Sequence, residues 1–239
     1  KLNTGTKDLR HGYILEEFVR FGASEDILVD AKPHVGTDRL YVVLQNLRRE
    51  IIDRGGEVRF SHKVVDIEQN SGSVTALPAS TPAETVLSGG YDGVLLSNGP
   101  GDPAENTDMI REIKKLYDSG LPLYGICLGH QMLALATGAR TGKMDYGHRG
   151  GNHPVRDVER GRVFITSQNH GYMVLADTVD PVVAQVSHIN ANDGTCEGLR
   201  YRRPNCFSTQ FHPEANPGPR DMEYLFDRFV ASMGGKTNE

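Results

Sequence analysis

The stretch GICLGHQ, residues 125–131, decides how this chain is interpreted, because it places a thiol between an apolar run and a helix-forming run. Residues 121–126 predict a buried strand, and residues 129–137 predict a helix that ends at Gly138. The flanking glycines allow a sharp strand-to-helix turn. Unpaired N–H groups at a helix start favour a thiolate. Cys127 is therefore a candidate nucleophile, although a free cysteine is often only a small buried side chain.

A second segment, QFHPE at residues 210–214, supplies groups that could activate this thiol. Residues two apart on an extended chain project to the same side, so His212 and Glu214 can face one site. A thiol, an imidazole and a carboxylate form the triad used in acyl transfer. A histidine and a glutamate at this spacing also occur by chance on ordinary surfaces.

A third segment, LLSNGPGDP at residues 95–103, predicts a strand that runs into a glycine-rich loop. Such a loop brings backbone close to a ligand and can offer N–H groups to an oxyanion. The alternative is an ordinary turn before the helix predicted at residues 107–119. The loop lacks the lysine and hydroxyl of a phosphate-binding loop, so nucleotide binding is not expected.

Five motifs in a fixed order carry a resemblance to a known family. They are LSNGPGDP at 96–103, GICLGHQ at 125–131, GHRGGNHPV at 147–155, TSQNHGY at 166–172 and QFHPEANPGP at 210–219. With these motifs, residues 74–233 resemble the glutaminase domain of the carbamoyl-phosphate synthetase small subunit, which is one of the class I (triad) glutamine amidotransferases.

The resemblance implies a role for each matching position. Cys127 would attack the side-chain amide of glutamine, His212 would act as base and then acid, and Glu214 would orient His212. The backbone N–H groups of Gly99 and Leu128 would form the oxyanion hole.

The resemblance also implies a glutamine pocket. Its remaining members would be Gly101, Gln131, Asn169, Gly171 and Tyr172. Gln131 lies one helical turn beyond the candidate nucleophile and therefore on the same helix face. Tyr172 is a departure, since phenylalanine is also common there; the added hydroxyl should be tolerated.

In this family the ammonia passes to a large synthetase subunit, which is therefore the expected partner beside L-glutamine. The implied pathway is arginine or pyrimidine synthesis. No cofactor is expected, because the chain carries no ATP-binding sequence of its own.

Residues 1–70 do not fit this resemblance, so the predicted domains are an atypical N-terminal α+β segment at 1–70 and an amidotransferase domain at 71–239. Residues 1–68 weakly resemble an internal piece of an FAD-dependent dehydrogenase, but without the G-x-G-x-x-G fingerprint no FAD binding is expected. A fusion, a fragment and an artificial join are all open, and Lys1 in place of methionine agrees with a fragment.

A physical alternative lets this segment complete the fold. Residues 38–54 predict a helix ended by two glycines, and residues 57–68 alternate as a strand. The apolar stripe of the helix consists of Leu40, Val43, Leu44, Leu47, Ile51 and Ile52. The residues expected to point inward from the strand are Val58, Phe60, Val64 and Ile67. This pair could cover the sheet of the second domain.

The order of elements predicts an α/β fold. After the junction we expect strand 74–78, helix 82–88, strand 93–97, helix 107–119, strand 121–126, helix 129–137, short strands to about 211 and helix 220–232. Alternating strands and helices favour a flavodoxin-like parallel sheet with helices on both faces and the site at its carboxyl edge.

Composition sets weaker bounds. With 26 basic and 31 acidic residues of 239, the chain is mildly acidic, and nothing indicates nucleic acid or a lipid surface as a partner. Three cysteines suggest reduced thiols and a cytoplasmic protein, with Cys196 and Cys206 structural. No apolar run approaches the ~20 residues of a membrane span.

Three histidines, His148, His153 and His170, lie close in sequence and raise the question of a metal. Their spacings match no standard zinc pattern, so no metal is expected.

Two further functional classes compete with a working glutaminase. One is a non-catalytic remnant or scaffold in which the triad survives but the truncated fold no longer supports turnover. The other, an FAD-dependent oxidoreductase piece, is supported only by residues 1–68.

Overall fold

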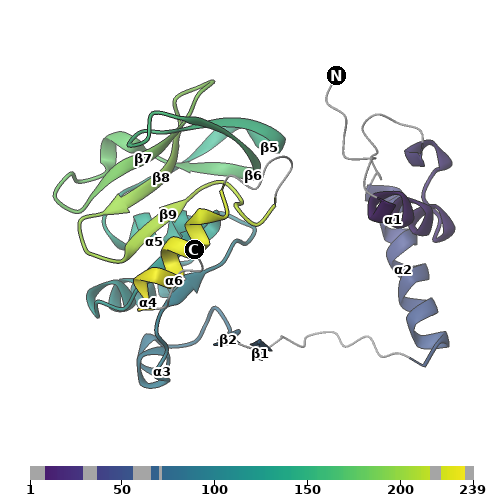
Figure 1. Ribbon diagram of the computed structural model, residues 1–239, viewed down its shortest axis with the longest axis horizontal. Helices are drawn as coiled ribbons and strands as arrows, with labels where there is room; N and C mark the ends of the chain where they lie inside the picture. Colours follow the sequence, from purple (N-terminus) through teal and green to yellow (C-terminus); the bar gives the residue numbers. More distant parts are fainter. Residues whose placement is uncertain (1–8, 29–36, 56–65, 70–71, 216–221, 235–239) are drawn as a thin grey trace. The chain divides into compact units, whose positions relative to one another are not determined.

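A computed structural model of the chain describes residues 9–28, 37–55, 66–69, 72–215 and 222–234. The chain divides into two compact units, Lys1–Ala76 and Leu77–Glu239. Figure 1 shows the elements of each. The domain junction predicted after residue 70 lies outside the described residues, so that boundary stays a prediction.

In the first unit, the described residues form two helices, a short 3-10 helix and a pair of antiparallel strands. They are α1 (Leu9–Arg20), η1 (Glu25–Leu28), α2 (Thr37–Asp53), β1 (Asp66–Gln69) and the antiparallel β2 (Gly72–Thr75). Its small core consists of Phe21, Ala23, Ile27 and Val43, with Leu15, Phe18, Val19 and Leu47 packed against it. Helix α2 confirms the helix predicted at 38–54, and it ends before Gly55, which has a φ of 81° that suits glycine.

The apolar stripe predicted on α2 is only partly buried. Val43 is fully buried and Leu47 packs beside it, but Leu44, Ile51 and Ile52 are exposed. The side chain of Leu40 lies outside the described residues, as do residues 57–65 of the strand predicted at 57–68. Strand β1 pairs with β2, whereas all strands of the larger sheet belong to the second unit. The proposal that residues 38–68 cover that sheet stays a hypothesis.

The second unit is built on a seven-stranded sheet in the order β3-β4-β9-β8-β6-β5-β7. The strands are β3 (Val94–Leu96), β4 (Leu123–Ile126), β5 (Thr141–Asp157), β6 (Val163–Val174), β7 (Ala184–Asn190), β8 (Cys196–Tyr201) and β9 (Cys206–Thr209). The helices are α3 (Ala83–Ser88), α4 (Thr107–Asp118), α5 (Leu128–Ala136) and α6 (Tyr224–Ser232), with short 3-10 turns η2 (Pro103–Glu105) and η3 (Ala176–Thr178).

The sheet is mixed and not parallel throughout. Strands β3, β4 and β9 are mutually parallel, and the other pairings are antiparallel. The short strands expected up to residue 211 include two long ones, β5 and β6. Irregularities interrupt the β5–β6 register after Lys143 and after Gly150, and such bulges shift the two-residue periodicity that would have revealed one continuous strand.

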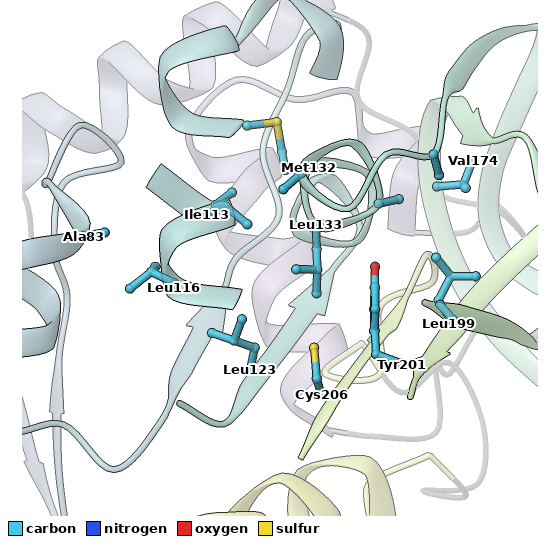
Figure 2. Close-up of a cluster of buried hydrophobic side chains, with 14 of the residues drawn as sticks. Ala83, Ile113, Leu116, Leu123, Met132, Leu133, Val174, Leu199, Tyr201 and Cys206 are labelled. Carbon is cyan, nitrogen blue, oxygen red and sulfur yellow. The ribbon is translucent and has the colours of Figure 1, made fainter. Parts of the chain in front are cut away.

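Alternation along the parallel strands confirms that helices cover both faces of the sheet. Leu123 and Cys206 point into a core shared with α3, α4 and α5, part of which is drawn in Figure 2. The next residues, Tyr124 and Phe207, stack with ring centroids 4.3 Å apart in a second core that includes side chains of α6. Successive side chains of a strand point to opposite faces, so the two cores lie on opposite sides.

Helix α5 packs very tightly on the strands that precede it. A Cβ on Gly129 would lie 2.1 Å from the carbonyl oxygen of Leu96, and one on Gly125 would lie 2.7 Å from the carbonyl oxygen of Gly129. Real Cβ atoms do not approach backbone this closely, so only glycine fits at either position. The glycines of GICLGHQ are therefore required by helix–strand contact as well as by the turn.

Among the residues that the structure describes, no helix has both the length and the apolar character needed to cross a bilayer.

The close contact at Gly129 predicts a large cost for a single methyl group. Gly129→Ala should destabilise the second unit by about 1–3 kcal/mol or more, because the backbone of β3 must move. Urea unfolding followed by far-UV circular dichroism measures this. Gly171→Ala is the matched control, since its added Cβ would meet only the end of an arginine at 3.7 Å. Equal midpoints for the two variants would show that the helix–strand contact is not tight.

Candidate active site

Cys127 occupies a strained turn at the carboxyl end of β4. It is the residue before helix α5, with φ 53° and ψ −104°, and its side chain is buried. Positive φ is uncommon for residues with a Cβ and is concentrated at functional sites. The N–H of Cys127 donates to the carbonyl oxygen of Thr209 at 2.9 Å, which fixes the turn to the end of β9.

His212 follows β9 and is fixed by the neighbouring part of the sheet. Its backbone N–H donates to the carbonyl oxygen of Ser167 on β6 at 2.9 Å. Its ring Nδ1 lies 2.7 Å from Oε1 of Glu214, within hydrogen-bond distance. The structure thus brings together His212 and Glu214 as the sequence spacing predicts.

The electrostatics of His212 favour its charged form. A hydrogen bond with Cys127, and then one with Glu214, raise the pKa of His212 to about 10, against the opposing effect of burial. Burial alone would raise the pKa of Glu214, but hydrogen bonds from His212 and backbone lower it overall. An imidazolium between a thiol and a carboxylate is the arrangement that activates a cysteine nucleophile.

A cavity of about 720 Å³ opens beside these groups. Eight of the ten residues predicted for the site line it, namely Cys127, His212, Gly99, Gly101, Gln131, Asn169, Gly171 and Tyr172. Glu214 stands behind His212. Leu128 does not line the cavity, but its side chain lies against Gly99, where an added Cβ would come within 2.8 Å of it. The two segments expected to provide oxyanion N–H groups are therefore neighbours.

Gln131 is held rigidly at the base of the cavity. Its Nε2 donates to the carbonyl oxygen of Tyr172 at 2.7 Å and to Oε1 of Gln210 at 2.8 Å. Burial and the nearby Asp102 raise the pKa of the Tyr172 hydroxyl. Tyr172 and the loop that carries Gly99 and Gly101 line the same cavity.

Charged residues that the sequence analysis did not single out also line the cavity. They are Asp102, Lys143, Asp145 and Arg149. The only signal for Arg149 was its place within the quoted stretch GHRGGNHPV. Its Nη1 donates to the carbonyl oxygen of Tyr146 at 2.6 Å, which keeps the guanidinium near the cavity wall.

The structure also brings two of the three weighed histidines together. His148, His170 and the buried Glu197 have potential ligand atoms within 4.8 Å of one another, the one such group among the described residues. His153 lies beside them, with its ring 5.0 Å from that of His148. Sequence reasoning missed Glu197 because it lies on β8, far from the histidines in sequence.

Comparison with known proteins shows which family this chain resembles. Residues 46–232 match the family described as glutamine amidotransferase class-I. A carbamoyl phosphate synthase small chain of Symbiobacterium thermophilum is 48% identical over 188 residues, which are 78% of this chain and 47% of that protein. One from Staphylococcus epidermidis is 52% identical over 164 residues, 67% of this chain and 44% of that protein. The chain thus spans about half the length of these relatives.

Solved structures agree at the level of the fold. A Thermoplasma acidophilum protein, proposed to be part of a GMP synthase, superposes with a TM-score of 0.56 over 66% of this chain and 79% of its own, at 22% identity. The expected class I amidotransferase fold is confirmed by this likeness and by the family match.

The environments of the three thiols predict selective alkylation. Burial raises the pKa of Cys196 to about 12 and that of Cys206 to about 11, so neither should react at neutral pH. Cys127 faces the cavity and His212, and iodoacetamide should label it first. Peptide mass spectrometry reads the outcome, with the urea-unfolded chain, in which all three should react, as control. Equal labelling of the three in the folded chain would contradict this description.

Proposed function

The chain belongs to the class-I glutamine amidotransferase family, and from this we propose that it hydrolyses the side-chain amide of L-glutamine and releases ammonia. The observation that carries the proposal is the His212–Glu214 hydrogen bond of 2.7 Å beside Cys127, at the wall of a cavity large enough for an amino acid. Here a nucleophile, a base and a carboxylate that orients the base are neighbours among the described residues.

The first half of the proposed reaction forms a thioester. The Cys127 thiolate, whose proton is held by His212, attacks the amide carbon of glutamine, and the electron pair of the carbonyl moves to oxygen. Backbone N–H groups of Gly99 and Leu128 stabilise this oxyanion. The C–N bond then breaks as His212 gives its proton to the leaving nitrogen, so ammonia departs and a glutamyl thioester remains.

The second half restores the thiolate beside a protonated His212. His212, now neutral, takes a proton from water, and the resulting hydroxide attacks the thioester carbon. Collapse of the second oxyanion breaks the C–S bond, and glutamate leaves as Cys127 is regenerated. Glu214 keeps the imidazole oriented throughout, because its carboxylate accepts from Nδ1.

The amino acid end of glutamine is proposed to lie along Gly101, Asn169, Gly171 and Tyr172, with Gln131 at the base. This assignment is supported by the fact that all five line one cavity with Cys127. Free glutamine carries one positive and one negative group, and the same cavity contains residues of both signs, including Asp102 and Arg149.

We further propose that the ammonia is delivered to the large subunit of a carbamoyl-phosphate synthetase in the cytoplasm, within arginine or pyrimidine synthesis. Two relatives described as carbamoyl phosphate synthase small chains are 48% and 52% identical to this chain over the matched regions. The sequence motifs of this chain account for the release of ammonia, and none of them is an ATP-binding sequence that would serve its later use.

A second candidate is a scaffold or remnant that keeps the triad without turnover. It is favoured by one observation: residues 1–76 form a compact unit of their own, apart from the unit that contains the triad.

Ammonia release from glutamine by the purified chain separates the candidates. Turnover that disappears in Cys127→Ser establishes the glutaminase, since the hydroxyl is a much weaker nucleophile than the thiolate. Addition of a synthetase large subunit should accelerate release if the chain is a component of such a complex. Absence of release in both settings, from protein that is folded by circular dichroism, would favour the scaffold.

Replacement of the carboxylate that orients His212 should lower the rate of turnover. Glu214→Gln should lower kcat about 10²-fold, because the amide cannot stabilise the imidazolium of His212. KM should change little, since Glu214 does not line the cavity. The matched control is Glu84→Gln, the same chemical change at an exposed helix position. A kcat equal to that of the control would mean that Glu214 takes no part in catalysis.

A further inference from the structure

A buried charged network that the proposed reaction does not use lies behind one wall of the cavity. Its centre is His148 on β5. Ring Nδ1 lies 2.8 Å from Oε1 of Gln168 and 3.2 Å from Oε1 of Glu197, and ring Nε2 lies 2.8 Å from Oδ2 of Asp193. His148 and Gln168 are buried, and Glu197 is 0% exposed.

The contacts of His148 favour its charged form. The three nearest oxygens can accept protons from both ring nitrogens. The one nearby donor, Nδ2 of Asn190, lies farther from Nδ1, at 3.4 Å, and donates to Oε1 of Glu197 at 3.1 Å. Hydrogen bonds to Glu197 and Asp193 raise the pKa of His148 to about 9, although burial opposes them. At neutral pH an imidazolium therefore lies between two carboxylates, one of them fully enclosed.

The network continues from this ion pair to the floor of the cavity. Oε1 of Gln168 also lies 2.9 Å from Nε2 of His170, whose Nδ1 lies 2.8 Å from the carbonyl oxygen of Tyr172. The same carbonyl oxygen accepts from Gln131 at 2.7 Å. Burial lowers the pKa of His170, so its neutral ring donates to one of these two oxygens at a time. A series of polar contacts thus links His148 to two residues of the proposed glutamine pocket.

The backbone ladder alone supports this part of the sheet poorly. Between two irregularities, β5 and β6 keep three consecutive pairs, His148–His170, Arg149–Asn169 and Gly150–Gln168. Side chains alternate along β6, so when the network holds residues 168 and 170 from one side, it sets the position of Asn169 and Gly171 on the other. Both of those residues line the cavity.

Hydrogen bonding explains the cluster better than a metal does. The three potential ligands lie within 4.8 Å of one another, but Oε1 of Gln168 already lies within hydrogen-bond distance of both histidines. A metal would also require neutral imidazole, whereas the two carboxylates beside His148 keep it protonated.

We propose that His148 and Glu197 are positioning residues, which hold the segment 168–172 in the geometry that receives the amino acid end of glutamine. The inference rests on the proposed function, because it assigns a task to the wall of that same cavity. Neither residue touches the reacting atoms. Their loss should therefore change substrate binding more than the chemical step.

Steady-state kinetics test whether these residues affect glutamine binding more than the chemical step. His148→Gln and Glu197→Gln should each raise KM for glutamine about tenfold, the cost of leaving a buried charged group without its partner, while kcat changes less than about threefold. The double variant should recover part of the loss, since it removes both buried charges together and leaves only Asp193, whose side chain is 43% exposed, without its histidine partner. His153→Gln is the matched control, a histidine of the same strand beside the network, and it should keep the wild-type KM.

A binding measurement distinguishes failure of this inference from failure of the proposed function. In the Cys127→Ser background, calorimetry measures glutamine affinity without turnover, and His148→Gln should weaken it about tenfold. If the wild-type chain binds glutamine in this way but releases no ammonia, the proposed function fails and the positioning role stands. Unchanged affinity and KM in both single variants, or no glutamine binding by the folded chain, would overturn the inference. So would stoichiometric zinc, measured by elemental analysis, that disappears in His148→Gln.

Discussion

The contact between helix α5 and strand β3 at Gly129 is the constraint on which the rest of the site depends. The backbone of helix α5 lies directly against the carbonyl oxygen of Leu96, so the chain must turn sharply between β4 and α5. Cys127 occupies this turn with a positive φ. The same contact places the start of the helix beside the loop that follows β3. One packing requirement therefore positions both the thiol and the two segments expected to stabilise the oxyanion.

The remaining groups reach the site through the order of strands in the sheet. Strand β9 lies beside β4, so the residues after it, His212 and Glu214, arrive next to Cys127 although they are distant in sequence. The antiparallel strands β5 and β6 then supply the wall of the cavity. The parallel part of the sheet carries the proposed chemistry, and the antiparallel part carries the proposed substrate contacts.

Local pattern predicted the parts of this structure that depend on nearby residues. The glycine-flanked turn, the helices on both faces and the pairing of His212 with Glu214 follow from spacing and periodicity. The length of β5 did not, because its bulges break the two-residue alternation. Glu197 and Gln168 also escaped detection, since a buried network between strands has no signature in sequence spacing. On α2, the apolar stripe predicted a buried face, but Leu44, Ile51 and Ile52 are exposed in their unit.

The proposed reaction requires a covalent bond between Cys127 and the acyl group of glutamine, and mass spectrometry of the chain quenched in acid during incubation with glutamine detects it. We expect a glutamyl adduct on the peptide that contains Cys127, and no adduct on the peptides of Cys196 or Cys206. An adduct absent from Cys127 while ammonia is released, or one found on another residue, would contradict the proposed reaction.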